Sequence, residues 1–379
     1  MNIAFTGGMS GGHFYPLIAV AEALNDIVRE QRLVEPKLYY LAPEPFDQNA
    51  LFENGITFIR IPAGKTRRYF SVRNFTDIFV SLRGILKAII ALYRMYPDVV
   101  VSKGGYASVP TVLAARILRI PVVIHESDSR PGRANLLASK FAAKIAISFD
   151  ESAQFFPAKV RDKIARTGIP IRKALMRTEA EGARQYLNLE PGIPTVLILT
   201  GSLGAQRINE AVVTALPALI SFANVIHQTG PAHIKTTEAI TSVTLSNDAH
   251  AQRYHAYGFL DEISLQRAAG VADIVVSRAG AGAISEIALW KKPALLIPIP
   301  ESVSHDQLSN AYAYARTGAA VVIEEANMTP HVIASEIQRI VNDKELSERM
   351  SKSAAGFTDP DAARVLANAV LALALEHEV

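Results

Sequence analysis

The sequence predicts an α/β protein made of two doubly wound domains, each with a parallel sheet between layers of helices. Short runs rich in β-branched residues alternate with segments of helical period along the whole chain, a pattern typical of parallel sheets. The chain has 379 residues, more than a single hydrophobic core usually organises. Its two halves also resemble each other, which favours two domains of similar topology.

Each predicted strand is a short apolar run that is bounded by turn residues or by a helical pattern. In the first half the strands are predicted at Asn2–Thr6, Lys37–Ala42, Ile56–Ile61, Asp98–Ser102, Val122–His125 and Lys144–Ser148. In the second half they are predicted at Thr195–Thr200, Asn224–Gln228, Arg253–Tyr257, Asp273–Ser277, Ala294–Pro298 and Ala320–Ile323. We therefore expect six strands in each half.

The internal repeat defines the expected domains. "DVVVSKGG" at Asp98–Gly105 is matched by "DIVVSRAG" at Asp273–Gly280, and "FTGG" at Phe5–Gly8 by "LTGS" at Leu199–Ser202. A composition break at Ala165–Leu175 predicts the linker. We expect domains at 1–165 and 166–359, with the last segment, 360–379, packing back on the first domain.

Composition excludes several classes of protein. The chain has no cysteine, which excludes disulfides, a thiolate nucleophile and cysteine-bound metals. A strand begins at the second residue, so no secretory signal peptide is predicted, and no uncharged run reaches the ~18 residues of a membrane-spanning helix. A net charge of +3 does not by itself indicate a nucleic-acid partner, and we expect none.

The first predicted strand is followed by a glycine-rich loop, Gly7, Gly8, Gly11 and Gly12, and by His13. An apolar stripe of helical period runs from Leu17, and Pro16 suits a first helical turn. Loop and helix start would form an anion site of phosphate size. His13 near the helix start would stay neutral, as a general base requires. A tight turn without a ligand, and a packing or capping histidine, explain the same residues.

Three more loops follow strand ends. They are "SKGGYASVP" at Ser102–Pro110, "LTGSLGAQRINEAVV" at Leu199–Val213 and "SRAGAGAISEIALW" at Ser277–Trp290. Glu286, expected in the first turn of the last helix, could accept hydrogen bonds from a ribose diol or simply match the helix dipole. Asp306, Gln307 and Asn310 follow another strand and suit sugar hydroxyls, although polar loop residues are common. For the glycine loops that begin at Ser102 and Leu199, a simple turn without a ligand is the alternative explanation.

The segment Lys65–Lys87 contains six basic residues and one acidic residue, with aromatic and apolar residues at helical spacing among them. Such a segment could lie on an anionic membrane. A core helix with a basic outer face is the alternative.

Together, these motifs resemble the MurG family of peptidoglycan glycosyltransferases, in glycosyltransferase family 28. The resemblance rests on "TGGMSGGHFYP", "KGGYASVP", "IHESDSRPGRAN", "TGSLGAQRINE", "HQTG", "GFLDE", "SRAGAGAISEIA" and "HDQLSNA", in the family's order from residue 3 to about residue 325. It implies a GT-B fold, two Rossmann-like domains facing a cleft. It also implies inverting transfer of N-acetylglucosamine from UDP-N-acetylglucosamine to the muramyl C4 hydroxyl of undecaprenyl-diphosphoryl-N-acetylmuramoyl-pentapeptide (lipid I). No cofactor and no chelated metal ion are expected.

The resemblance also implies roles for residues. His13 would be the catalytic base, and the acceptor would meet Ser10, Gly11, Gly12, Gly104, Gly105 and Tyr106. UDP-N-acetylglucosamine would meet Asp128, Arg172, Ser202, Phe259, Leu260, Ala281, Glu286, Asp306, Gln307 and Asn310. Expected partners are an anionic phospholipid surface at the cytoplasmic side of the cell membrane, where the protein would be peripheral, and proteins of cell-wall synthesis.

Some positions depart from the family pattern. The family commonly has His-Glu-Gln-Asn where this chain has His125-Glu126-Ser127-Asp128, and a polar residue where it has Leu203. At position 128 a carboxylate thus takes the place of the amide that the family pattern has at the expected sugar contact. Alternatives remain another GT-B glycolipid glycosyltransferase, a UDP-N-acetylglucosamine 2-epimerase, a dehydrogenase, which the missing G-x-G-x-x-G disfavours, and a non-catalytic nucleotide-binding protein.

Overall fold

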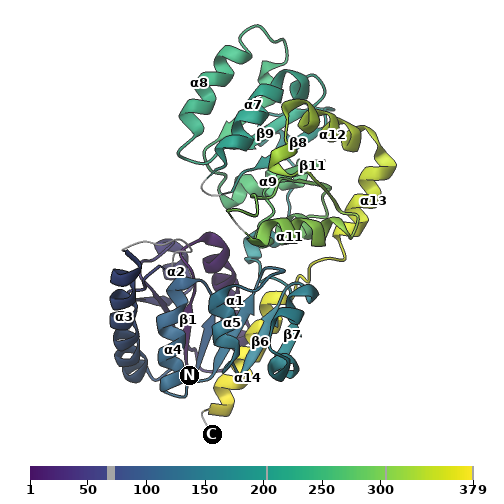
Figure 1. The fold of residues 1–379 in the computed structure, drawn as a ribbon. Coiled ribbons are helices and arrows are strands. Elements are labelled where there is room, and N and C mark those ends of the chain that lie inside the picture. Colours follow the sequence, from purple (N-terminus) through teal and green to yellow (C-terminus); the bar gives the residue numbers. More distant parts are fainter. Residues whose placement is uncertain (66–72, 202–203, 304, 378–379) are drawn as a thin grey trace. The chain divides into compact units, whose positions relative to one another are not determined.

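The computed structural model describes residues 1–65, 73–201, 204–303 and 305–377 of the chain. The chain forms two compact units. Unit 1 comprises Met1–Arg172 and Asp359–Val379, and unit 2 comprises Lys173–Thr358. Each unit is an α/β structure with its own parallel sheet (Figure 1).

Unit 1 contains a seven-stranded sheet in the order β3-β2-β1-β4-β5-β6-β7 among its described residues. The strands are β1 (Asn2–Thr6), β2 (Lys37–Ala42), β3 (Ile56–Arg60), β4 (Val99–Ser102), β5 (Val122–Glu126), β6 (Lys144–Ile147) and β7 (Ile164–Arg166). Its helices are α1 (Gly11–Glu30), α2 (Gln48–Glu53), α3 (Arg73–Met95), α4 (Val109–Ile117), α5 (Arg133–Ser139) and α14 (Ala362–His377), with short 3-10 turns η1 (Tyr106–Ser108), η2 (Asp150–Phe155) and η3 (Ala158–Lys163).

Unit 2 contains a six-stranded sheet in the order β10-β9-β8-β11-β12-β13 among its described residues. The strands are β8 (Thr195–Leu199), β9 (Asn224–Gln228), β10 (Tyr254–Tyr257), β11 (Ile274–Ser277), β12 (Ala294–Leu296) and β13 (Ala320–Val322). Its helices are α6 (Ala183–Tyr186), α7 (Gln206–Ile220), α8 (Ile234–Thr244), α9 (Glu262–Val271), α10 (Ala281–Leu289), α11 (His305–Ala315), α12 (Pro330–Asn342) and α13 (Lys344–Ala354), with η4 (Lys173–Met176), η5 (Ala251–Arg253) and η6 (Glu325–Asn327).

The two sheets confirm the predicted fold class and the internal repeat. In both, the first strand along the chain lies in the middle, and the order reverses between it and the fourth strand, β1 beside β4 and β8 beside β11. Ligands of doubly wound sheets bind beyond the carboxyl ends of the strands at this reversal. The four glycine loops of the sequence follow β1, β4, β8 and β11, so they lie at these two edges.

Two details of the strand prediction were wrong. A seventh strand, β7, lies partly within the segment that we expected to be linker, and it pairs with β6. Its three residues, Ile164–Arg166, are too few and too exposed to give an apolar pattern. Several strands also end one or two residues earlier than predicted, as β12 does at Leu296.

Both faces of each sheet are covered. In unit 1, α1 and α14 pack on one face, while α3, α4 and α5 pack on the other. In unit 2, one face is covered by α6, α9, α10 and α11, and the other by α7 and α12. The strands are buried on both sides, which explains why their sequences are almost continuously apolar.

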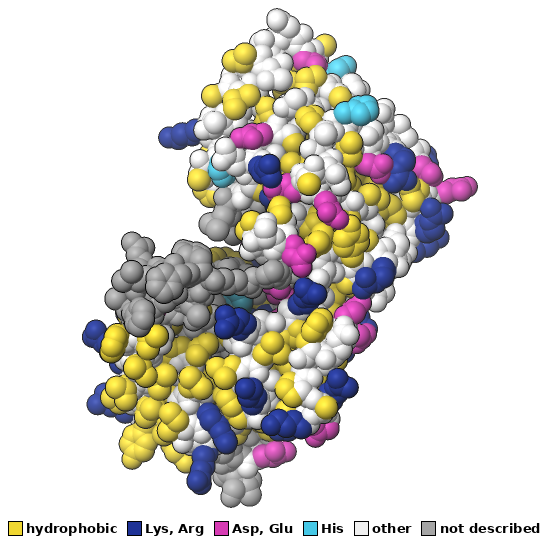
Figure 2. Space-filling view, in the orientation of Figure 1, with side chains coloured by type: hydrophobic (Ala, Val, Ile, Leu, Met, Phe, Trp, Pro, Cys, Tyr) yellow, Lys and Arg dark blue, Asp and Glu magenta, His cyan; other side chains and the backbone are white. Residues whose placement is uncertain are grey.

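Helix α3 buries one face and presents several large apolar residues to solvent on the other. Gly84, Ala88 and Leu92 are buried on the inner face of the helix. A stripe of exposed side chains, here called the α3 patch, lies on the outer face: Ile78, Phe79, Leu82, Leu86, Ile90 and Tyr93. Figure 2 shows hydrophobic side chains, with Lys and Arg among them, over the region of α3 and α4. Scattered exposed apolar residues are normal, but a continuous stripe of this length indicates a contact surface.

The close packing of α3 depends on Gly84. A Cβ atom at this position would lie 2.0 Å from the carbonyl oxygen of Pro62, so any side chain forces the helix away from the segment after β3. We expect Gly84→Ala to lower the free energy of unfolding by about 2 kcal/mol, because the overpacking outweighs the better helix propensity of alanine. Urea unfolding measures this change. Gly356→Ala is the control, since a Cβ there meets open space, and equal stability of the two variants would contradict the packing argument.

Candidate functional site

The carboxyl ends of β1 and β4 bring two glycine loops together around one imidazole. Thr6 and Ser102 pair at the ends of these strands, and the loops begin directly after them. A Cβ atom on Gly8 would lie 2.9 Å from the His13 ring, and one on Gly105 would lie 2.8 Å from the Gly8 Cα and 3.3 Å from His13 Nε2. Gly104 and Gly105 also have positive φ angles, 81° and 79°. Only glycine fits on both sides of His13.

His13 is held in place by Ser10. The Ser10 Oγ and His13 Nδ1 atoms are 2.7 Å apart, and Ser10 is the N-cap residue of α1. Burial, and then the charge of Lys103, lower the pKa of His13 to about 4. The imidazole is therefore neutral near pH 7. When Nδ1 carries the proton and donates to Ser10, the lone pair of Nε2 faces the Gly105 side of the site.

Helix α1 begins earlier than the sequence suggested. The Ser10 carbonyl accepts hydrogen bonds from the backbone N–H groups of His13 and Phe14, both at 3.0 Å, so Gly11 and Gly12 are the first two helical residues. We had expected Pro16 in the first turn, but it lies inside the helix. The glycines thus give the exposed start of a 20-residue helix, the end that attracts anions.

A buried polar cluster around Glu126 lies at the carboxyl end of β5, in the same sheet. The Glu126 carboxylate accepts hydrogen bonds from the Asp128 N–H (3.0 Å), the Gly132 N–H (2.9 Å) and Asn135 Nδ2 (2.9 Å). Burial, then the neighbouring Asp128, raise the pKa of Glu126 to about 7, while Lys103 opposes them. Sequence reasoning assigned no role to Glu126, Asn135 or Lys103. The available signal for Glu126 and Lys103 was their place directly after predicted strands, whereas Asn135 lies on α5 and is joined to Glu126 only by a hydrogen bond of the folded chain.

The remaining candidate residues of unit 1 are Tyr106, Asp128 and Arg172. Tyr106 opens η1 directly after Gly105, and the Lys65 ammonium lies 5.5 Å from the centre of its ring. Asp128 is half-buried and follows β5. The Arg172 guanidinium lies over the ring of Tyr15, 3.9 Å from its centre, and Tyr15 donates to Asp47 Oδ2 at 3.2 Å. Asp128 and Arg172 thus belong to unit 1, whereas the other expected donor-binding residues belong to unit 2.

In unit 2, Gln228 joins two loops at the sheet edge. Its Nε2 donates to the Gly201 carbonyl at 3.3 Å, and its Oε1 accepts from the Leu260 N–H at 3.0 Å. Ser202 and Leu203, which follow Gly201, lie outside the described residues. The Leu260 side chain is 2% exposed and belongs to the core, whereas Phe259 is 57% exposed. Sequence reasoning quoted "HQTG" but missed Gln228, because pairing of the two loops is a long-range contact.

Helix α10 begins at Ala281 with Gly280 as its N-cap. Glu286 therefore lies in the second turn, and its predicted place in the first turn is wrong. The Gln307 Oε1 accepts from the Ile299 N–H at 3.2 Å, and the Asn310 Nδ2 donates to the Ala279 carbonyl at 3.4 Å. The structure thus joins Asn310 of α11 to the loop before α10 and Gln307 of α11 to the segment after β12. Asp306 is half-buried at the start of α11.

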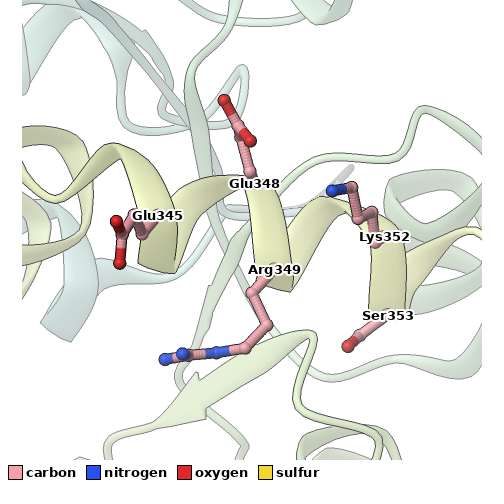
Figure 3. Close-up of a pocket in the computed structure, with 5 residues that line it drawn as sticks. All are labelled: Glu345, Glu348, Arg349, Lys352 and Ser353. Carbon is pink, nitrogen blue, oxygen red and sulfur yellow. The ribbon is translucent and has the colours of Figure 1, made fainter.

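A hollow beside α13 has a different character. It is lined by Glu345, Glu348, Arg349, Lys352 and Ser353, all from one helix (Figure 3). Glu348 and Arg349 point to opposite sides of the helix, so the charged groups do not converge. A Cβ atom on Gly318 would lie 3.3 Å from the Ser353 Oγ, so Ser353 lies near the start of β13 and not near its carboxyl end. We assign no function to it.

No helix in the described part of the chain combines the length and the apolar composition that crossing a bilayer requires.

Comparison with known proteins identifies relatives along almost the whole chain. The glycosyltransferase family 28 N-terminal domain matches residues 3–147, and the family's C-terminal domain matches residues 195–366. The chain is 33% identical to the UDP-N-acetylglucosamine–N-acetylmuramyl-(pentapeptide) pyrophosphoryl-undecaprenol N-acetylglucosamine transferase of Treponema denticola, over 97% of this chain and 96% of that protein.

Solved structures have the same fold. MurG from Acinetobacter baumannii superposes with a TM-score of 0.73 at 25% identity, covering 98% of this chain and 99% of that one. A UDP-GlcNAc 2-epimerase from Neisseria meningitidis, solved with bound UDP-GlcNAc, superposes with a TM-score of 0.69 at 15% identity, covering 98% and 100%. The latter likeness concerns the fold alone. Because the N-terminal and C-terminal domains of the family both match the chain, in this order, the chain belongs to glycosyltransferase family 28.

Proposed function

We propose that the chain transfers N-acetylglucosamine from UDP-N-acetylglucosamine to the muramyl C4 hydroxyl of lipid I, which gives lipid II for peptidoglycan synthesis. The observation that carries this proposal is the match to transferases named for this reaction over nearly the full length of both proteins, 97% and 96% for the Treponema denticola enzyme. It is an enzyme of the hexosyltransferase class, and no resident cofactor enters the scheme.

The acceptor is assigned to the β1 and β4 edge of unit 1. Its diphosphate would lie at the start of α1, where Ser10, Gly11 and Gly12 place backbone at the positive end of the helix dipole. Gly104, Gly105 and Tyr106 would form the opposite wall, because Gly105 lies against Gly8 and His13. The acceptor diphosphate brings negative charge close to His13, and such charge raises the pKa of an imidazole towards neutrality.

His13 would act as the catalytic base. Its Nε2 accepts the proton of the C4 hydroxyl while that oxygen forms a bond to the anomeric carbon and the bond to UDP breaks. Attack comes from the face opposite UDP, so the configuration inverts. Ser10 on Nδ1 fixes the ring and the tautomer that leaves Nε2 free of its proton. Helix starts and backbone amides stabilise the leaving diphosphate in place of a chelated cation.

UDP-N-acetylglucosamine is assigned to unit 2. The Gly201–Gly204 turn with Ser202 would bind the diphosphate, and Glu286 the ribose. Phe259 would cover the uracil, with Leu260 contributing its backbone and Ala281 the start of α10. Asp306, Gln307 and Asn310 would meet the sugar, and Asp128 and Arg172 of unit 1 complete the expected set. The hydrogen bonds of Gln228 to both loops support this assignment, because they hold Gly201 and Leu260 in one arrangement.

The α3 patch is assigned to an anionic membrane surface at the cytoplasmic side of the cell membrane, where lipid I is embedded. Its apolar side chains are accompanied by the exposed cations Arg83, Lys87 and Arg94. Apolar insertion combined with attraction to anionic lipid is how interfacial helices bind. Residues 66–72, which carry further basic and aromatic positions of the predicted segment, lie outside the described residues.

His13→Ala should lose turnover by roughly 10²–10⁴-fold, the usual contribution of a general base, and should keep UDP affinity. A short-chain lipid I analogue and radiolabelled UDP-N-acetylglucosamine, with excess chelator, measure transfer and UDP release. His331→Ala, an exposed position on α12, is the control. Unchanged turnover of His13→Ala would remove this residue from the mechanism, and absolute dependence on added magnesium would contradict the metal-free scheme.

Gln228→Leu should weaken UDP binding by about tenfold, because the Leu260 N–H loses its partner and the Gly201 loop loses its anchor. Isothermal titration calorimetry with UDP measures the change. The control is Gln185→Leu on the exposed side of α6. Equal affinity in the two variants would show that the loop pair does not shape the nucleotide site.

Replacing Phe79 and Leu86 of the α3 patch with serine should lower partitioning onto vesicles that contain phosphatidylglycerol by about tenfold, since both side chains lose apolar insertion. Co-sedimentation measures partitioning. The matched control replaces Ile240 and Val243, two exposed apolar residues of α8, with serine. Equal binding of the two double variants would refute the assignment of the membrane surface to α3.

A further inference from the structure

Lys103 is a buried cation at the centre of the unit 1 site. It follows β4 directly, its backbone N–H donates to the Thr6 carbonyl at 2.9 Å, and its side chain is 3% exposed. A Cβ atom on Gly7 would lie 3.4 Å from its Cβ, so the residue sits beside the first glycine loop. Its Nζ donates to the Ser127 Oγ.

Burying an ammonium group is costly unless negative charge accompanies it. The charged or titratable groups that face Lys103 among the described residues are His13 from α1, and His125, Glu126 and Asp128 from β5 and the turn after it. Burial lowers the pKa of Lys103, and Glu126 and Asp128 counteract this effect. Glu126 and Asp128 thus favour the charged form of Lys103.

Asp128 gains a physical explanation from this arrangement. The family pattern commonly has a neutral asparagine there, whereas the Asp128 carboxylate raises the pKa of the neighbouring Glu126. The Lys103 ammonium, bound to Ser127 between these two residues in the chain, offsets part of that repulsion. The internal repeat of the sequence offers a parallel for a cation paired with an acid at this position. Arg278 follows β11 at the position equivalent to Lys103, and its guanidinium lies 2.6 Å from the Glu325 carboxylate in unit 2.

We propose that Lys103 is a positioning residue, whose ammonium neutralises the carboxylates of Glu126 and Asp128 and so holds the turn after β5 beside His13. The proposal rests on the proposed function, which makes His13 the base. The same positive charge lies close enough to His13 to help keep its imidazole unprotonated. Lys103 thus prepares the site in two ways, through the shape of the turn and through the protonation state of the base.

The first test uses the substrate-free protein and no activity measurement. The C2–H resonance of His13, assigned by its loss in His13→Ala, is titrated by NMR in the wild type and in Lys103→Met. Removing a positive neighbour raises the pKa of a histidine, so we expect a shift upward by roughly half a unit to one unit. Lys144→Met, exposed at the opposite end of the same sheet, should leave it unchanged. An unmoved His13 titration in Lys103→Met overturns the proposal.

The second test compares charge balance. Lys103→Met leaves two neighbouring carboxylates without their cation, and we expect a lower melting temperature at pH 8 and about tenfold or greater loss of kcat with little change in KM for UDP-N-acetylglucosamine. Lys103→Met combined with Asp128→Asn removes one charge of each sign and should recover part of both losses. If the double variant loses as much melting temperature and kcat as Lys103→Met, the proposal is overturned. It is also overturned if the double variant loses more, as expected when two sites act independently.

The same variants separate this proposal from the proposed function. If the wild type shows no transfer to a lipid I analogue, the function fails, while the His13 titration and the melting temperatures still decide the role of Lys103. If the wild type is active, the acidic limb of its kcat/KM profile should move to higher pH in Lys103→Met, in the direction of the His13 titration. A limb that stays in place while turnover falls indicates a merely structural role and overturns the proposal.

Discussion

The site in unit 1 depends on the close packing of two backbone loops against the imidazole of His13. Gly8 and Gly105 lie on either side of His13 with no space for a Cβ atom between them, and this packing depends on β1 and β4 being neighbours in the sheet. The reversal of strand order, the glycines and the histidine are thus parts of one arrangement. A side chain on either loop would displace the ring from Ser10. The contact therefore leaves no space for a larger residue at Gly8 or Gly105.

The sequence predicted the sheets well because strand ends coincide with strong local signals. The repeat of "DVVVSKGG" and "DIVVSRAG" has a physical basis: Asp98 accepts from the Asn2 N–H at 2.7 Å, and Asp273 accepts from the Thr195 N–H at 2.8 Å. In each unit the acid joins the start of the first strand to the start of the fourth. Buried on both faces, these strands are apolar throughout, so their positions could be read with an error of one or two residues.

What the sequence could not predict depends on long-range contacts. The start of α1 at Gly11 is set by the Ser10 carbonyl, and the start of α10 places Glu286 one turn later than expected. Gln228 joins loops that follow β8 and β10, and Lys103 is explained only by acids that come more than twenty residues later. The site residues inferred from the family remain predictions where their role requires a bound substrate, and Ser202 lies outside the described residues.

The last helix has a consequence for how the polypeptide is made. Helix α14 packs on α1 within the core of unit 1, where Ala367, Val370 and Ala374 are buried, and Arg364 pairs with Glu30. The α1 face of unit 1 therefore stays incomplete on the ribosome until all of unit 2 has been translated. During that interval the apolar side chains that α14 covers stay exposed on the nascent chain, and exposed apolar surface of this kind favours aggregation.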